Sequence, residues 1–377
     1  MKRNHSPALV GALGASVALS LVVAMAPAQA AADDYDVLVV GKTTGFRHSS
    51  IDEATTAVMA LGEANGFTVD VWDPPTPAGR WGASPGQPER TLESTPFTSA
   101  ENLAKYETIV FVSTVDGTNS LDPALPTLLD GSELEAFQGY IRAGGGYAGV
   151  HAATDSMHTV PWYGQLTGGG ARFISHPAQQ TATQTVEDGT HPSTEHLDES
   201  WTRFDEWYNF TQSPRPVVRV LTNLEETTYN PGRNAMGEDH PLSWCQNIEG
   251  ARSWYTGGGH TEASYTDPAF LQHLLGGIAW TARAVSGGGD CVTWYEVDTL
   301  VSDLLDEGAI SQKAATQLDR QLAEAQELAD AGEPAEAAEK LNAAAAQVRA
   351  HVRDNADARE TLAGKVSDLQ TWQRELG

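Results

Sequence analysis

The chain has 377 residues and a formal net charge of −27, and 40% of its residues are hydrophobic. This composition excludes an intrinsically disordered chain and leaves room for two globular domains. The strong negative charge argues against nucleic acid or an anionic membrane surface as a partner, but it names no substrate.

The first 30 residues carry the pattern of a secretory signal peptide. Lys2 and Arg3 form a positive start, an apolar run covers residues 8–25, and residues 28–30 read Ala-Gln-Ala, as at a cleavage site. A single anchoring helix is the alternative. No later apolar run approaches the roughly 20 residues that a transmembrane helix needs. We therefore expect a secreted, extracellular protein without a transmembrane segment.

Strand and helix patterns alternate over the next part of the chain. Buried strands are expected at residues 36–41, 67–72, 107–113 and 144–150, and helices at 51–65, 100–106 and 132–143. The intervening segments 73–98 and 114–130 have the composition of loops. This alternation predicts a doubly wound, mostly parallel sheet with helices on both faces.

The middle and the end of the chain differ in composition. Further strands are expected at residues 173–177, 181–187, 203–210, 217–224, 241–245 and 251–256, followed by a helix at 269–284. Beyond them, Ala and Leu recur at helical spacing, which predicts a small bundle of four helices with a solvated acidic face. We thus expect an α/β domain over residues 34–284, a Gly-rich linker at 285–292 and a helical domain at 293–377.

The chain has two cysteines, Cys245 and Cys291, and both lie beyond the signal peptide. In an oxidising compartment we expect a disulfide bond between them, which would tie the sheet domain to the linker. A cysteine nucleophile is the alternative, but neither residue lies in an elbow-like sequence.

Histidines follow several of the predicted strands. His48 follows the first strand, His151 the glycine-rich strand, His176 a strand of the middle region and His260 the last strand, while Glu206 lies within the strand at 203–210. Because the carboxyl ends of parallel strands share one edge of a sheet, we expect several of these side chains to converge. They could divide acid and base roles, or bind a divalent metal through His48, His151 and His260. No H-x-x-x-H or H-E-x-x-H spacing supports a metal, and a structural role for each histidine is the alternative.

Other residues near these segments could bind a substrate. Trp207 and Trp244 offer aromatic faces that suit the apolar faces of sugar rings, with core packing as the alternative, and Arg47 and Asp155 could hold hydroxyl groups. The first turn, at residues 42–50, is not a G-x-G-x-x-G fingerprint, and no Walker lysine follows it. This argues against a nucleotide site at that turn.

Several motifs, taken in order, resemble the trehalose-utilisation (ThuA-like) domain over residues 34–284. They are Gly45-Phe46-Arg47-His48, the run Gly145-Gly146-Tyr147-Ala148-Gly149-Val150-His151-Ala152-Ala153-Thr154-Asp155, Asp205-Glu206-Trp207-Tyr208, His240-Pro241-Leu242-Ser243-Trp244 and Gly259-His260. The resemblance implies a flavodoxin-like sheet similar to that of class I glutamine amidotransferases, and a role in sugar or disaccharide metabolism. In those enzymes the elbow holds a catalytic cysteine. Here His151 takes that place, so amidotransferase activity is not implied.

The helical end of the chain resembles the FIMAH domain, which is appended to secreted bacterial glycosidases and polysaccharide lyases. The match is carried by Val297-Asp298-Thr299-Leu300, by Gly308-Ala309-Ile310 and by Leu341-Asn342. It implies association with a glycan or a cell surface rather than catalysis.

Together these features favour an extracellular enzyme that acts on a sugar or glycoside, such as a disaccharide or an oxidised sugar. The residues expected to act on the substrate are His151, His48, Glu206 and His260. Those expected to bind it are Arg47, Asp155, Trp207 and Trp244. The alternative is a non-catalytic carbohydrate-binding or cell-surface protein on a degenerate amidotransferase-like scaffold. The cofactor stays open, with a divalent metal as the candidate.

Overall fold

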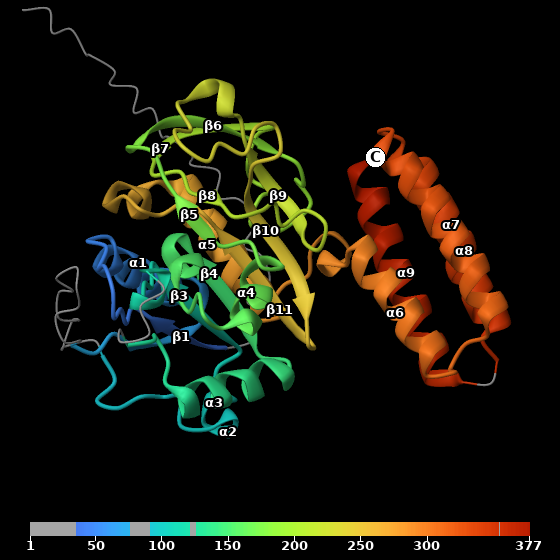
Figure 1. Cartoon of the computed structure of the whole chain (residues 1–377), viewed down its shortest axis with the longest axis horizontal. Helices are drawn as coiled ribbons and strands as arrows, with labels where there is room; N and C mark the ends of the chain where they lie inside the picture. The colour runs from blue at the N-terminus through green and yellow to red at the C-terminus, as the bar shows by residue number, and fades with distance from the viewer. Residues whose placement is uncertain (1–34, 76–90, 121–125, 354) are drawn as a thin grey trace, which may run out of the picture. The chain divides into compact units, whose positions relative to one another are not determined.

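The computed structural model describes residues 35–75, 91–120, 126–353 and 355–377 (Figure 1). The signal peptide expected at residues 1–30 lies outside these residues, as does the middle of the loop expected at 73–98. None of the helices in the described parts is long and apolar enough to cross a membrane.

A nine-stranded mixed sheet lies at the centre of the first part of the chain. In spatial order its strands are β2 (Thr68–Trp72), β1 (Asp36–Val40), β3 (Thr108–Val112), β4 (Gly146–Val150), β11 (Ala251–Thr256), β10 (Pro241–Ile248), β9 (Arg219–Leu224), β6 (Gln180–Val186) and β7 (Ser200–Asp205). The first five run parallel, and the other four extend the sheet with antiparallel pairings. The order of the five parallel strands is that of a flavodoxin-like sheet, which confirms the expected fold class.

Helices cover both faces of the parallel strands. They are α1 (Ile51–Asn65), α2 (Ala100–Leu103), α3 (Gly131–Arg142), α4 (Pro161–Gly168) and α5 (Pro268–Thr281). Because successive side chains of a strand point to opposite faces, Val37 and Val39 pack in the core that holds α1 and α5. Leu38 and Val40 pack in the core that holds α3 and α4. The apolar run at residues 36–41, which predicted a buried strand, therefore packs side chains into a hydrophobic core on each face of the sheet.

The strand expected at residues 203–210 is in fact two strands. Strand β7 ends at Asp205, and β8 (Asn209–Phe210) pairs with β5 (Phe173–Ser175) in a separate two-stranded sheet. Glu206 therefore lies in the break between two sheets rather than inside a strand. Without a ladder position to fill, its side chain can turn towards the edge of the large sheet.

The turns beside the sheet also differ from expectation. The residues after β4 form a 3-10 turn, η2 (His151–Asp155), instead of entering an α-helix directly, and α4 was not predicted. The other short turns are η1 (Gly117–Ser120), η3 (Glu226–Thr228), η4 (Glu262–Thr266) and η5 (Gly288–Cys291). Ser50 lies at the N-cap of α1, but its hydroxyl donates to the Gly259 carbonyl at 3.1 Å instead of capping the helix.

The four expected helices of the C-terminal part are present. They are α6 (Trp294–Asp306), α7 (Gln312–Asp330), α8 (Pro334–His351) and α9 (Ala356–Leu376). Their apolar stripes form a core of their own, in which Val301, Leu322 and Leu362 are buried. Cys245 of β10 is bonded to Cys291 of η5 as the sequence predicted, with 5.9 Å between the two Cα atoms.

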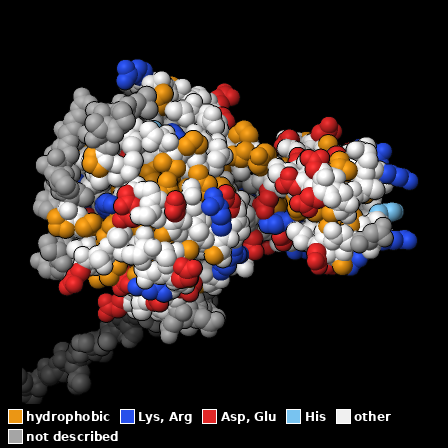
Figure 2. All heavy atoms as spheres, turned by 60° about the horizontal axis from the view of Figure 1, so that its bottom comes forward, with side chains coloured by type: hydrophobic (Ala, Val, Ile, Leu, Met, Phe, Trp, Pro, Cys, Tyr) orange, Lys and Arg blue, Asp and Glu red, His pale blue; other side chains and the backbone are white. Residues whose placement is uncertain are grey.

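Figure 2 shows how the charged side chains are distributed on one face of the molecule. On the face drawn in Figure 2, acidic and basic side chains are interspersed among polar and apolar ones. The excess of acid is therefore shared across this face instead of forming one large patch, so the net charge by itself marks no binding surface.

Candidate functional site

Four side chains from separate parts of the chain meet at one edge of the sheet. His48 follows β1, His151 follows β4, His260 follows β11 and Glu206 follows β7, and one potential ligand atom from each lies within 4.8 Å of the others. The three histidines come from the carboxyl ends of parallel strands, where ligands of such sheets usually bind. The structure thus brings together the four residues expected to act on a substrate.

His151 is held in a strained turn at the end of β4. Its φ is 49°, a left-handed conformation that residues other than glycine rarely adopt and that is often found at functional sites. The hydroxyl of Tyr255 donates to the His151 carbonyl at 2.7 Å, and the ring of Tyr208 packs against the imidazole with 4.2 Å between centroids. The turn is therefore fixed from both sides.

The hydrogen bonds of His151 define which nitrogen faces the other residues. Its Nδ1 lies 3.0 Å from the Gly257 carbonyl oxygen. Because a carbonyl oxygen can only accept, Nδ1 carries a hydrogen. In the neutral ring Nε2 is then a lone pair, and it points to Nδ1 of His260 at 3.2 Å and to Oε2 of Glu206 at 3.5 Å.

Glu206 is shared by three histidines. Its Oε2 lies 3.1 Å from Nδ1 of His260, and its Oε1 lies 3.0 Å from Nδ1 of His176, whose side chain is 42% exposed. Burial alone would raise the pKa of Glu206, but the hydrogen bonds with His151 and His260, and their charges, outweigh burial and lower it. The carboxylate is therefore ionised. The sequence placed His176 only at a strand end, and its contact with Glu206 comes from the pairing of β5 with β8.

His48 completes the group from the opposite side. Its ring meets those of His151 and His260 edge to face, at 5.0 and 5.1 Å between centroids. Its Nδ1 is buried and has no hydrogen-bond partner among the described residues. Burial, with the neighbouring histidines, lowers the pKa of His48 well below its ordinary value, so the ring is neutral and offers an unused polar atom.

Asp205 fixes the position of two of these residues, and sequence reasoning missed it. Its Oδ1 accepts from the backbone N–H groups of Glu206 at 2.9 Å and His260 at 3.0 Å. Its Oδ2 accepts from the N–H of Gly259 at 2.8 Å and pairs with Arg203 at 2.9 Å. One fully buried carboxylate thus connects the end of β7 to the loop after β11. The adjacent acidic pair in the sequence was the only signal that could have found it.

The structure uses two of the expected substrate-binding residues for internal contacts. Arg47 makes two contacts with Asp73, at 2.7 and 2.6 Å, and one with Asp52 at 2.9 Å, and its side chain is only 7% exposed. Asp155 is buried and lies 2.9 Å from Nε2 of His158. The expected contact of Arg47 with a substrate is not supported, because its guanidinium is already committed to holding the loop before α1.

The two expected aromatic platforms lie in the core. Trp207 is fully buried and donates its indole N–H to the Gln180 carbonyl at 2.8 Å. Trp244 is 1% exposed and donates to the Thr167 carbonyl at 2.8 Å. Because neither ring presents a face to solvent, the expectation that they stack on a sugar is corrected. The alternative of core packing describes both residues.

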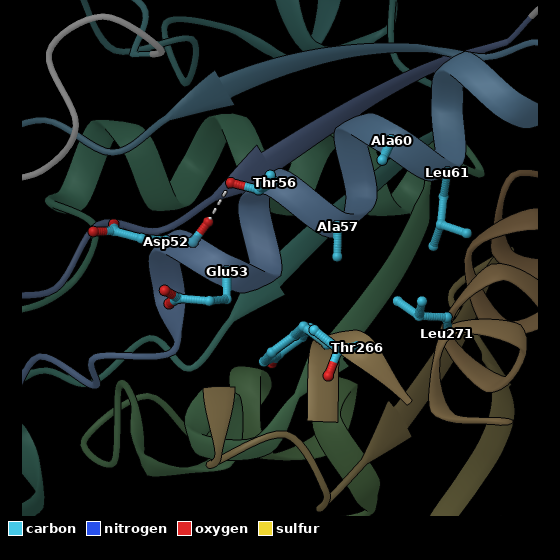
Figure 3. A pocket seen from close by; sticks show the side chains of 9 residues that line it. Asp52, Glu53, Thr56, Ala57, Ala60, Leu61, Thr266 and Leu271 are labelled. Carbon is cyan, nitrogen blue, oxygen red and sulfur yellow. Dashed lines mark hydrogen bonds between the residues drawn. The ribbon is translucent and has the colours of Figure 1, made fainter. Parts of the chain in front are cut away.

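A separate hollow lies beside α1. Its volume is about 630 Å³, and it is lined by Asp52, Glu53, Thr56, Ala57, Ala60, Leu61, Tyr265, Thr266 and Leu271 (Figure 3). None of the four converging residues lines it, and most of its wall is apolar. Tyr265 connects the hollow to them, because its hydroxyl donates to the Gly259 carbonyl at 2.9 Å, next to His260. The candidate site is therefore defined by its chemistry, not by the size of a hollow.

The strand order defines a doubly wound, flavodoxin-like α/β protein, and ligands of such sheets usually bind at the carboxyl edge. Residues 36–281, more than half of the chain, match the family model described as trehalose utilisation (ThuA), and the chain belongs to this family. Residues 296–371 match the model of the FIMAH domain.

Two solved structures are similar to this chain, and the first shares its fold. A protein described as ThuA-like from Bacteroides uniformis is 23% identical, with a TM-score of 0.52, over 68% of this chain and 95% of the other. One from Parabacteroides merdae is 18% identical, with a TM-score of 0.48, over 66% of this chain and 90% of the other. The comparison with curated proteins found no match.

Proposed function

We propose that the protein is a secreted enzyme that acts on a sugar or glycoside, with His48, His151, Glu206 and His260 as its reactive groups. The observation that carries the proposal is the convergence of their ligand atoms within 4.8 Å. Buried polar groups normally have partners of their own, whereas these histidines share one carboxylate and leave Nδ1 of His48 without a partner among the described residues. Membership of the ThuA family supports a sugar as the substrate.

We also propose that the cofactor is a divalent metal ion. Nε2 of His151 lies 3.5 Å from Oε2 of Glu206 and 3.2 Å from Nδ1 of His260, so a proton or a cation must lie between these atoms. Three imidazoles and a carboxylate form a donor set that suits zinc or a related first-row ion. Such an ion, when bound, polarises a carbonyl or hydroxyl oxygen of the substrate.

The other residues support these groups. The carbonyl of Gly257 fixes the tautomer of His151, as a hydrogen-bonding partner behind a ligand histidine does. Glu206 is ionised, so it can accept a proton from water or from a substrate hydroxyl. His176 is half exposed and touches the second oxygen of Glu206, which gives that proton a route to solvent.

The location of the protein and the role of its tail are proposals of the same kind. A disulfide and the absence of a membrane-spanning helix among the described residues are compatible with a secreted protein. The signal peptide at residues 1–30 and the division into domains at 34–284 and 293–377 complete this interpretation. The FIMAH match supports association of the helical domain with a glycan or a cell surface.

The test combines metal analysis with a substrate screen. Purified protein is assayed by plasma mass spectrometry and then screened, with and without EDTA, against disaccharides, aryl glycosides and their keto derivatives. His151→Ala should lose both metal and turnover at unchanged circular dichroism, and the control His351→Ala, which removes an exposed histidine of α8, should lose neither. Sugar binding without turnover would favour the non-catalytic alternative. Full turnover in His151→Ala would refute the proposal.

A further inference from the structure

One exposed aromatic ring touches the candidate site. Phe46 is 47% exposed, and its ring meets the ring of His48 edge to face, with 4.9 Å between centroids. Phe204 and Tyr295 are exposed to a similar degree, but within the described residues neither ring contacts a histidine of the site. An exposed large apolar side chain beside buried polar groups calls for an explanation.

The chain holds Phe46 in place from both sides. The N–H groups of Thr44 and Gly45 both donate to the Val115 carbonyl at 3.0 Å. A Cβ atom on Gly45 would lie 2.8 Å from a backbone oxygen of Asp116, so the loop packs directly against the chain after β3. On the other side, the Arg47 guanidinium is paired with the buried Asp73. Phe46 is therefore presented to solvent by a fixed loop.

We infer that Phe46 is the stacking platform for a pyranose ring whose reacting end lies at the histidines, an inference that rests on the proposed function. Aromatic faces carry negative charge density and attract the weakly positive C–H groups of an apolar face. A pyranose whose hydroxyls are equatorial presents such a face. The substrate class is therefore a pyranoside with an unbroken C–H face.

The Phe46 ring is in direct contact with the group of histidines. The centroids of Phe46 and His48 are 4.9 Å apart, and those of His48 and His151 are 5.0 Å apart, as expected for rings that touch edge to face. A sugar stacked on Phe46 would therefore lie next to His48, and Phe46 takes the role that Trp207 and Trp244 cannot fill from the core.

The test measures sugar binding by four forms of the full chain. Methyl β-D-glucopyranoside and cellobiose are titrated by calorimetry into the wild type, Phe46→Ala, Phe46→Trp and the matched control Phe204→Ala. We expect Phe46→Ala to weaken binding about fivefold or more, since an aromatic stacking contact is lost. Phe46→Trp should bind at least as well as the wild type, and Phe204→Ala should match it. In turnover assays Phe46→Ala should raise KM and leave kcat nearly unchanged.

A second measurement separates the outcomes. The new indole of Phe46→Trp should shift its emission when cellobiose is added, and that of Phe204→Trp should not. If Phe46→Ala does not fold, Phe46→Leu keeps the bulk without the ring and should show the same weakening. If the wild type binds sugar and Phe46→Ala or Phe46→Leu binds it equally well, this inference is overturned, but the proposed function is not. A wild type that binds and turns over no sugar overturns the proposed function and this inference with it.

Discussion

Two kinds of buried histidine occur in the same sheet-containing part of the chain. His273 of α5 is fully buried, its Nδ1 lies 2.7 Å from the Ser193 carbonyl, and its Nε2 lies 3.3 Å from the Ser243 hydroxyl. Each nitrogen has a partner of its own. At the candidate site, by contrast, His151 and His260 share Glu206, and Nδ1 of His48 has no partner among the described residues.

The convergence on one carboxylate distinguishes the candidate site more clearly than an unpaired nitrogen does, since Nε2 of the buried His191 is unpaired among the described residues as well. A buried histidine that only supports the fold is expected to satisfy both nitrogens, because an unpaired buried polar atom destabilises the protein. A group that leaves such an atom unpaired, and gathers three rings around one carboxylate, costs stability. Two exposed side chains, Phe46 and His176, contact this group and connect it to solvent. His273, by contrast, is fully buried.

The largest effect is expected from removing the shared charge. Glu206→Gln keeps the size of the side chain but removes the carboxylate, so turnover should fall at least about 100-fold and bound metal should be lost. Because the fold lowers the pKa of Glu206, its charge also stabilises the folded state, so the free energy of unfolding should fall as well and turnover is taken per folded molecule. Turnover and metal content are measured beside Glu199→Gln, an exposed control on the same part of the chain. Retained turnover in Glu206→Gln would place the chemistry elsewhere.

The reverse pattern is expected at the supporting histidine. His273→Ala removes two hydrogen bonds and leaves a cavity in the core, so the free energy of unfolding should fall by about 2–4 kcal/mol. Turnover per folded molecule should stay within twofold of the wild type. Urea unfolding and an assay on the folded fraction measure the two quantities. If His273→Ala lost turnover but kept the stability of the wild type, His273 could not be called a purely structural histidine.

The disulfide should contribute stability without taking part in the chemistry. It closes a sequence separation of 46 residues, so its loss should cost about 2–4 kcal/mol. Both cysteines are buried beside His191, in a group apart from the candidate site. Unfolding is compared before and after reduction, with alkylation and mass analysis to count free thiols. Two free thiols in the unreduced protein would contradict the bond itself.

The effect that is smallest at neutral pH concerns the pH dependence of stability. Burial lowers the pKa of His273 to about 3, so the folded state keeps this ring neutral while the unfolded state takes up a proton below its ordinary pKa of 6.5. The contribution to stability is therefore complete above pH 6.5 and is lost as the pH falls towards 3, by about 1.4 kcal/mol per pH unit. The unfolding free energy of His273→Gln should accordingly fall less steeply than that of the wild type between pH 6.5 and 5. Parallel curves would show that His273 does not titrate in this way.

Much of the fold follows from local patterns in the sequence. The apolar run at residues 36–41 and the glycines before His151 identify parallel strands, because their periodicity and turn signals act over a few residues. The same holds for the spacing of Leu318, Leu322 and Leu362 in the helical part. Since strand ends of a doubly wound sheet share one edge, the sequence could also place His48, His151 and His260 close together.

Other features depend on contacts between distant segments, and only the tertiary structure decided them. The pairing of β8 with β5 takes Glu206 out of a strand and brings His176 to it. Trp207 and Trp244 look alike in sequence whether they face a sugar or the core, and burial by other elements settles the matter. Phe46 shows the opposite case, because the packing of its loop leaves this aromatic ring exposed. The sequence thus determined which strand ends meet, and the packing around them decided which side chains remain open for chemistry.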